Sequence, residues 1–188
     1  MANLIPDGEY YIFNVATTSR CIDISGAQLQ KANAKVQLYD ILRNNAQAFT
    51  VRNSGGKVII TSRLFGNRFG PVSTSSTAEV KLNVKATGVP TNIAWDIQAT
   101  GTQKTHGGVA YDCYMLKYGG YNLYSAGTAN NSIIRMSTST GTQAQWYFIP
   151  IGQLDEGGLF EIRPWVGTHM AVDVEAAGQF NGTNVRLW

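Results

Sequence analysis

The sequence of 188 residues has little of what most catalytic and metal sites require. It contains two histidines, His106 and His169, and two cysteines, Cys21 and Cys113, and no cysteine–histidine pairing has the spacing of metal ligands. A site with three histidine ligands is excluded within one chain. The sequence also has no Gly-x-Ser-x-Gly elbow, no Gly-x-Gly-x-x-Gly fingerprint and no phosphate-binding loop. We therefore expect no enzyme activity, no metal and no cofactor, with a glycosidase-type pair of carboxylates as the remaining enzymatic alternative.

Charge and long apolar runs are scarce as well. Charged residues make up 14% of the chain, and its fifteen basic residues are scattered without forming a Lys/Arg run. Nucleic-acid-binding domains usually carry a basic stripe, so nucleic acid is not an expected partner. No apolar run approaches the eighteen residues of a membrane span, and no signal-peptide core follows Met1. Cys21 lies in a strand-like run where a small buried thiol is common, so two free thiols are favoured over a disulfide.

Sustained helical periodicity is absent, and short alternating runs between turn residues take its place. Such runs combine β-branched and aromatic residues and are typical of strands. They cover residues 10–13, 21–24, 35–39, 47–52, 58–60, 80–84, 95–97, 114–116, 121–124, 133–136 and 146–149. This pattern predicts an all-β protein.

Three of these runs begin with a large aromatic residue and are evenly spaced. Phe49, Trp95 and Trp146 lie 46 and 51 residues apart. Because side chains alternate along a strand, each aromatic ring and the apolar side chain two positions later are expected to point toward the core. Three repeats of four strands would give a twelve-stranded unit with threefold symmetry. This is the layout of a β-trefoil. Its closed barrel leaves few exposed strand edges.

The sequence restarts near its end. Asp173 lies 150 positions after Asp23, and Trp188 lies 149 positions after Tyr39. This offset indicates an internal duplication. We expect a trefoil at residues 1–152 and, at residues 153–188, a fourth repeat that is the first part of a second trefoil. Such a part cannot build its own core. Its apolar residues are therefore predicted to pack on the first trefoil or on a neighbouring chain: Phe160, Ile162, Val172 and Leu187.

The first repeat resembles the ricin-B-type lectins, also described as family 13 carbohydrate-binding modules. The resemblance rests on residues 22–24 (Ile-Asp-Ile), residues 36–39 (Val-Gln-Leu-Tyr) and residues 47–49 (Gln-Ala-Phe), a variant of the Gln-x-Trp signature. It covers residues 5–150 as three repeats and 157–188 as part of a fourth. It implies a β-trefoil that binds sugars, with galactose-type sugars as possible ligands.

By this resemblance, the candidate sugar-binding residues of the first repeat are Asp23, Gln37, Tyr39, Asn45 and Gln47. A carboxylate accepts hydrogen bonds from neighbouring sugar hydroxyls, and an aromatic ring contacts the C–H face of a pyranose. Asp23 could instead bond its own turn, and Gln47 could tie a loop to its strand.

The later repeats differ in what they retain of this set. The third has no acidic residue in the place of Asp23, and in the second Ile93 stands two residues before Trp95, where the signature has glutamine. In the fourth, Asp173 and Trp188 match Asp23 and Tyr39, and Arg186 replaces Gln37. We therefore expect a second, half-built site of the same kind there.

The resulting hypothesis is a non-catalytic, lectin-like module that recognises glycans in a shallow site and belongs to a larger protein. Its expected location, by resemblance, is extracellular or at the cell surface. Residues 157–188 could mediate self-association. The alternative is a β-trefoil that binds a protein or is purely structural, because Ala46 stands where the resembling proteins usually have asparagine.

Overall fold

The computed structural model describes residues 5–26, 33–63, 66–82 and 93–154, and the backbone of residues 172–174 and 185–187. The chain divides into two compact units, Met1–Gln153 and Leu154–Trp188. The regular elements of the first unit are β1 (Gly8–Asn14), β2 (Arg20–Ile24), β3 (Ala34–Asp40), β4 (Phe49–Ser54), β5 (Lys57–Ser62), β6 (Phe69–Pro71), β7 (Val80–Leu82), β8 (Asp96–His106), β9 (Val109–Tyr118), β10 (Tyr121–Ser125), β11 (Ile134–Ser137), the 3-10 turn η2 (Thr142–Ala144) and β12 (Trp146–Pro150). The expected all-β class is confirmed. Nowhere in the described ranges is there a helix long and apolar enough to cross a membrane.

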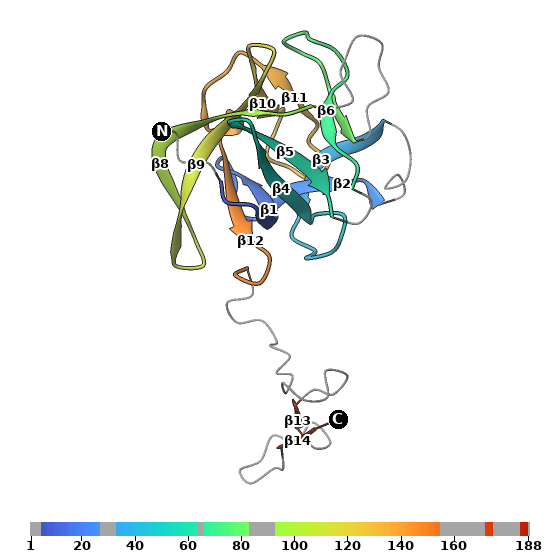
Figure 1. Ribbon diagram of the computed structural model, residues 1–188, viewed down its shortest axis with the longest axis vertical. Coiled ribbons are helices and arrows are strands. Elements are labelled where there is room, and N and C mark those ends of the chain that lie inside the picture. The colour runs from blue at the N-terminus through green and yellow to red at the C-terminus, as the bar shows by residue number, and fades with distance from the viewer. Residues whose placement is uncertain are drawn as a thin grey trace. The chain divides into compact units, whose positions relative to one another are not determined.

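Six strands of the first unit close a barrel (Figure 1). β1 pairs with both β4 and β12, β4 pairs with β5, β12 pairs with β9, and β9 pairs with β8. An antiparallel bridge between Val58 and Trp95 joins β5 to the start of β8 and completes the circuit.

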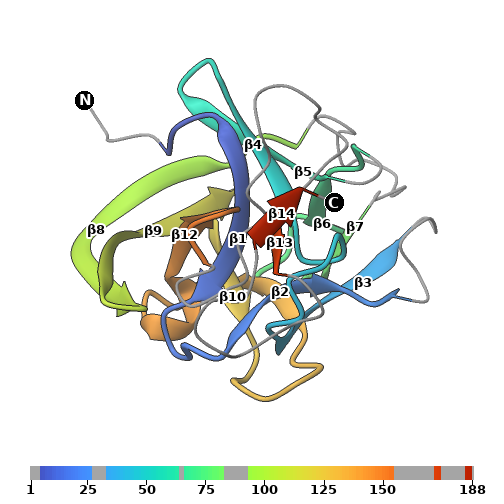
Figure 2. The same cartoon turned by 90° about the horizontal axis from the view of Figure 1, so that it is seen from below.

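The remaining strands form hairpins that meet one another at one end of the barrel. β2 pairs with β3, β6 with β7, and β10 with β11, while β3 also pairs with β7 (Figure 2). Bridges from Gln37 to Ile133 and from Glu79 to Arg135 tie the third hairpin to the other two. Residues of distant sequence segments are thereby brought side by side.

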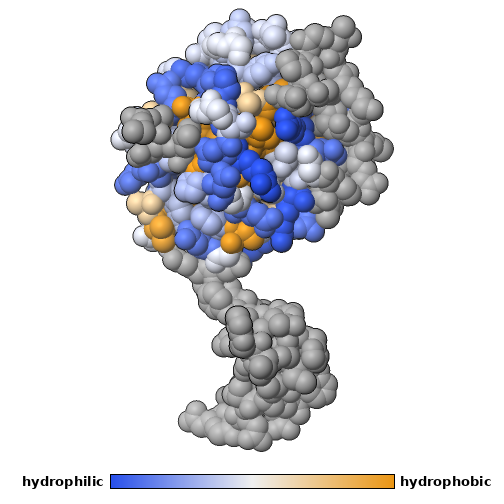
Figure 3. All heavy atoms as spheres, viewed as in Figure 1, coloured by the Kyte–Doolittle hydropathy of each residue, from blue (hydrophilic) through white to orange (hydrophobic). Residues whose placement is uncertain are grey.

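The core is built from the inward positions of these strands. Phe49, Trp95 and Trp146 are fully buried, which confirms the predicted direction of their rings. Phe69 lies against both Phe49 and Trp95, with ring centroids 5.8 and 5.6 Å apart. Hydrophilic residues cover most of the face seen in Figure 3, and the hydrophobic patches on it are small and separated.

Two features of the fold were not predicted from the sequence. One is β6, a three-residue strand that ends in a proline. The other is the length of the β8–β9 hairpin, which projects from the barrel and turns at two glycines with positive φ, Gly107 and Gly108 (Figure 1). Both cysteines are buried and free. The division of the sequence into three repeats remains a prediction.

The second unit contains one described hairpin, β13 (Val172–Val174) and β14 (Val185–Leu187). Its backbone register places Asp173 opposite Arg186. In β2–β3 the register likewise places Asp23 opposite Gln37. The predicted packing of this unit falls outside the described residues, because Phe160, Ile162 and the side chains of Val172 and Leu187 are not among them.

Candidate functional site

A hollow of about 330 Å³ lies along the β2–β3 hairpin. Three of the predicted site residues line it: Asp23, Gln37 and Tyr39. Asn44 and Asn131 complete its polar wall. We call this feature the Asp23 hollow.

Asp23 and Gln37 form a cross-strand pair at its base. They are direct partners in the β2–β3 register, and Gln37 Nε2 donates a hydrogen bond of 3.0 Å to Asp23 Oδ1. Only 4% of Asp23 is exposed. This burial raises the pKa of the Asp23 carboxyl above the ordinary aspartate value, although the amides of Gln37 and Gln47 act in the opposite direction. A carboxylate in such surroundings forms stronger hydrogen bonds than one in bulk water.

Tyr39 supplies the aromatic surface of the hollow. It lies two residues after Gln37 on β3 and is half-buried, while Val36 and Leu38, on the opposite side of the strand, are completely buried. The predicted alternation along β3 is therefore confirmed. An accessible ring beside a fixed carboxylate offers a sugar both an apolar face and a hydrogen-bond acceptor.

Gln47 lies inside the protein and does not line the hollow. Its Oε1 accepts hydrogen bonds from the backbone N–H groups of Leu42 (2.8 Å) and Arg43 (3.1 Å). Its Nε2 donates to the backbone oxygen of Asp40 at 2.7 Å. Gln47 thus ties the loop after β3 to the start of β4, which is the structural alternative considered for it above.

Replacing Gln47 with alanine is expected to lower the free energy of unfolding by about 1–3 kcal/mol, because three backbone groups lose their partner. Urea unfolding of the purified protein measures this change. Gln145→Ala is the matched control, since the Gln145 amide makes one exposed bond to Thr140 O, and its expected effect is within about 0.5 kcal/mol. Equal effects of the two substitutions would contradict a structural role for Gln47.

In the loop after β3, the asparagine that lines the hollow is Asn44. The predicted Asn45 is exposed and does not line it. Asn44 Oδ1 accepts a hydrogen bond of 3.0 Å from the N–H of Ala46, and this local turn positions Asn44 at the wall. Residue spacing alone does not reveal which of two adjacent asparagines forms such a turn.

Asn131 reaches the hollow from the loop between β10 and β11. Its φ of 65° is left-handed, and its N–H donates to Leu38 O at 2.8 Å. The preceding Asn130 anchors the loop, because its Nδ2 donates to Asp40 and its Oδ1 accepts from Arg20 Nε. The sequence analysis missed Asn131, since nothing in the local pattern signals a contact with β3 more than ninety residues away.

The predicted half-built site lies outside the described residues. Only the backbone of Asp173 is described, and Trp188 is not. In the part of the chain that the structure does describe, no three His, Cys, Asp or Glu side chains are grouped as a metal ion would require.

Comparison with known proteins places the fold. No family model matches the sequence, and the comparison with curated proteins gives no match either. Solved structures do match. ThreeFoil, a designed threefold-symmetric protein, is 20% identical over 76% of this chain and 99% of its own, with a TM-score of 0.62. A ricin B-like lectin from Macrolepiota procera, solved in complex with lactose, is 18% identical over 79% of this chain and 99% of its own, with a TM-score of 0.61.

An enzyme is also among the similar structures. An exo-β-1,3-galactanase from Clostridium thermocellum is 16% identical, with a TM-score of 0.62, and the match covers 78% of this chain but 31% of the enzyme chain. At these identities the likeness concerns the fold alone. The chain has the β-trefoil fold of the ricin-B type.

Proposed function

We propose that this protein is a non-catalytic, lectin-like module that binds a glycan in the Asp23 hollow. The observation that carries the proposal is the geometry of the hollow itself. A buried carboxylate is held in place by the Gln37 amide, and the Tyr39 ring lies on the same side of the hairpin. A sugar presents adjacent hydroxyls and an apolar C–H face, which these two groups complement.

The expected affinity is modest because the hollow is shallow. A single saccharide would bind with a Kd on the order of 0.1–1 mM, or about 4–5 kcal/mol. A second copy of the site, such as the one predicted at Asp173 and Trp188, would raise avidity toward a multivalent glycan.

Lactose is the first ligand to test, because the Macrolepiota procera lectin was solved in complex with it. The proposal includes an extracellular or cell-surface location and membership of a larger protein. In the galactanase the matching region makes up 31% of the chain, so this fold occurs there as part of a longer protein. Self-association through residues 157–188 is a further part of the proposal, and sedimentation of the protein with and without them tests it.

A protein-binding or structural trefoil is the second candidate. It is favoured by the low exposure of Asp23 and Gln37, which are 4% and 5% exposed and already bonded to each other. Under this candidate the pair would serve only to hold the hairpin together.

A thermal-shift titration distinguishes the two candidates. Lactose at about a hundred times its Kd is expected to stabilise a binding module by about 2.7 kcal/mol, and maltose serves as the control disaccharide. A glycan array then extends the search to other sugars. If no glycan stabilises or binds the intact protein, the proposed function is wrong.

A further inference from the structure

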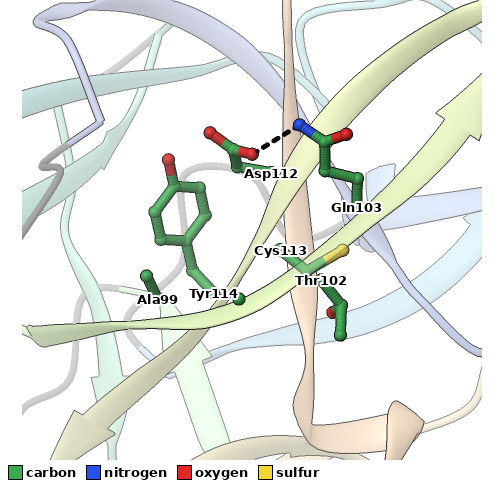
Figure 4. A pocket seen from close by; sticks show the side chains of 7 residues that line it. Ala99, Thr102, Gln103, Asp112, Cys113 and Tyr114 are labelled. Carbon is green, nitrogen blue, oxygen red and sulfur yellow. Dashed lines mark hydrogen bonds between the residues drawn. The ribbon is translucent and has the colours of Figure 1, made fainter.

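The projecting β8–β9 hairpin carries a second carboxylate–amide pair. Gln103 on β8 is the direct cross-strand partner of Asp112 on β9, and Gln103 Nε2 donates a hydrogen bond of 2.9 Å to Asp112 Oδ1. Tyr114 lies two residues further along β9. Its ring points to the same side as the pair (Figure 4). Asp112, unlike Asp23, is exposed and so can be reached from solvent.

This arrangement has the same parts as the Asp23 hollow. In both hairpins an aspartate and a glutamine face each other across antiparallel strands and are joined by an amide-to-carboxylate bond, of 3.0 Å in one and 2.9 Å in the other. In both, a tyrosine lies two residues from one member of the pair, on the same strand. The tyrosine follows Gln37 in the first hairpin and Asp112 in the second.

Two hollows of about 330 Å³ each meet at Asp112 and Tyr114. One is also lined by Thr102 and Gln103, which can form hydrogen bonds. The other is the more apolar of the two, and its further lining includes Pro6, Tyr10, Phe148 and Pro150. The Asp112 carboxylate therefore lies between a hydrogen-bonding surface and an aromatic one, which suits a ligand that is polar at its edge and apolar on its face.

The aromatic side is held by ring contacts. Phe148 packs edge-on against Tyr10 and Tyr114, with centroids 5.9 and 6.2 Å apart, and the Tyr10 hydroxyl donates to Pro6 O at 2.9 Å. These contacts fix the rings before any ligand arrives, which lowers the entropic cost of binding.

The hairpin is fixed at its bulge and at its tip. The register shifts between Ala99 and Gln103, where Gly101 has a φ of 73°, and residues of this bulge line the first of the two hollows. At the tip, His106 lies against Phe13 at 4.8 Å between ring centroids, and its Nδ1 is 3.1 Å from the Tyr147 hydroxyl. The tip of the hairpin is thus attached to the barrel.

From these observations we infer that the β8–β9 hairpin is a second saccharide-binding site. Asp112 accepts hydrogen bonds from adjacent sugar hydroxyls and Gln103 orients the carboxylate. Tyr10, Tyr114 and Phe148 are largely buried, and the accessible edges of their rings border the apolar face of the ligand. The ligand class rests on the proposed function, but the site is separate from the Asp23 hollow and from every sugar site that the sequence pattern predicts.

A site-resolved titration tests the inference. Lactose is added up to about 50 mM to the full-length, isotope-labelled protein, a range that covers millimolar affinity. Backbone amide signals are followed separately at Gln103, Asp112 and Tyr114 and at Asp23, Gln37 and Tyr39. Asp112→Asn is expected to weaken binding at the hairpin at least tenfold and to leave binding at the Asp23 hollow unchanged. Asp23→Asn is the matched control and should show the reverse.

The outcomes separate this inference from the proposed function. Saturable shifts at the hairpin that Asp112→Asn removes support the inference, even if the Asp23 hollow stays silent. If the Asp23 signals shift with lactose and the hairpin signals do not, the hairpin site is wrong and the proposed function stands. Hairpin shifts that persist unchanged in Asp112→Asn also overturn the assignment. If the amide signals at neither site respond to lactose, the hairpin is not a saccharide-binding site and the inference is wrong.

Discussion

Replacing Asp23 with asparagine is expected to weaken sugar binding at the Asp23 hollow by tenfold or more without destabilising the protein. Hydrogen bonds to a charged acceptor contribute about 1.5–3 kcal/mol each, more than those to a neutral one, and a loss of about 1.4 kcal/mol weakens binding tenfold. Asparagine keeps the side-chain shape and an oxygen that can still accept the Gln37 bond of 3.0 Å.

The stability of the same variant depends on pH in a defined direction. Burial raises the pKa of Asp23 in the folded protein, so the native state binds this proton more tightly than the unfolded state. The ionised carboxylate therefore lowers stability as the pH rises from the ordinary aspartate range through the raised pKa. Asp23→Asn lacks this loss, so it should be at least as stable as the parent at pH 7, with the difference vanishing below about pH 4.

Calorimetric titration with lactose and urea unfolding at several pH values measure both effects. Asp96→Asn is the control, since Asp96 is exposed at the start of β8 and its carboxylate forms an ion pair with Lys57. A variant that retains full sugar affinity, or that loses stability at pH 7, would assign Asp23 to the hairpin structure and favour the second candidate function.

This separation of binding from stability is what the geometry of the hollow implies. A buried carboxylate with a raised pKa is costly to the fold, and such costs are common where a group is kept for function. Gln47 shows the opposite case. It is as buried as the core residues, it bonds the backbone at Leu42, Arg43 and Asp40, and its replacement should affect stability first.

Periodicity in the sequence identified strands with one buried face, and it missed most of β8. Buried residues alternate with less buried ones at the start of β4 and along β5, so periodicity identified these strands. β8 is mostly exposed along its eleven residues and has no buried face beyond its start, so only residues 95–97 were detected. The pocket-forming bulge at Gly101 was therefore outside any predicted element.

The candidate site was predictable only in part, for a related reason. Asp23, Gln37 and Tyr39 lie on the paired strands β2 and β3, so strand pairing and alternation bring them together, and the sequence shows the alternation. The place of Asn131 depends on how distant segments meet in three dimensions, and the Asp112–Gln103 pair depends on the register of the local β8–β9 hairpin. A left-handed residue and a β-bulge decide these placements, and neither has a periodic signature.

Trp146→Ala is expected to have the largest effect on stability, about 3–5 kcal/mol, because a fully buried indole at the start of β12 is replaced by a methyl group. This is a large fraction of the 5–15 kcal/mol by which domains are stable, and it should lower the Tm by roughly 6–20 °C. Thermal and urea unfolding both report it. A loss below about 1 kcal/mol would show that the barrel closes without this side chain.

A comparison of two tryptophans isolates the hydrogen bond from the packing. Trp146 Nε1 donates to Leu123 O at 2.9 Å, whereas the equally buried Trp95 Nε1 has no partner among the described residues. Phenylalanine removes the N–H at both positions, so Trp146→Phe should cost about 1 kcal/mol more than Trp95→Phe. Phe49 shows that a phenyl ring is accommodated at the start of a barrel strand. Equal costs for the two variants would mean that packing alone accounts for the selection of tryptophan at Trp146.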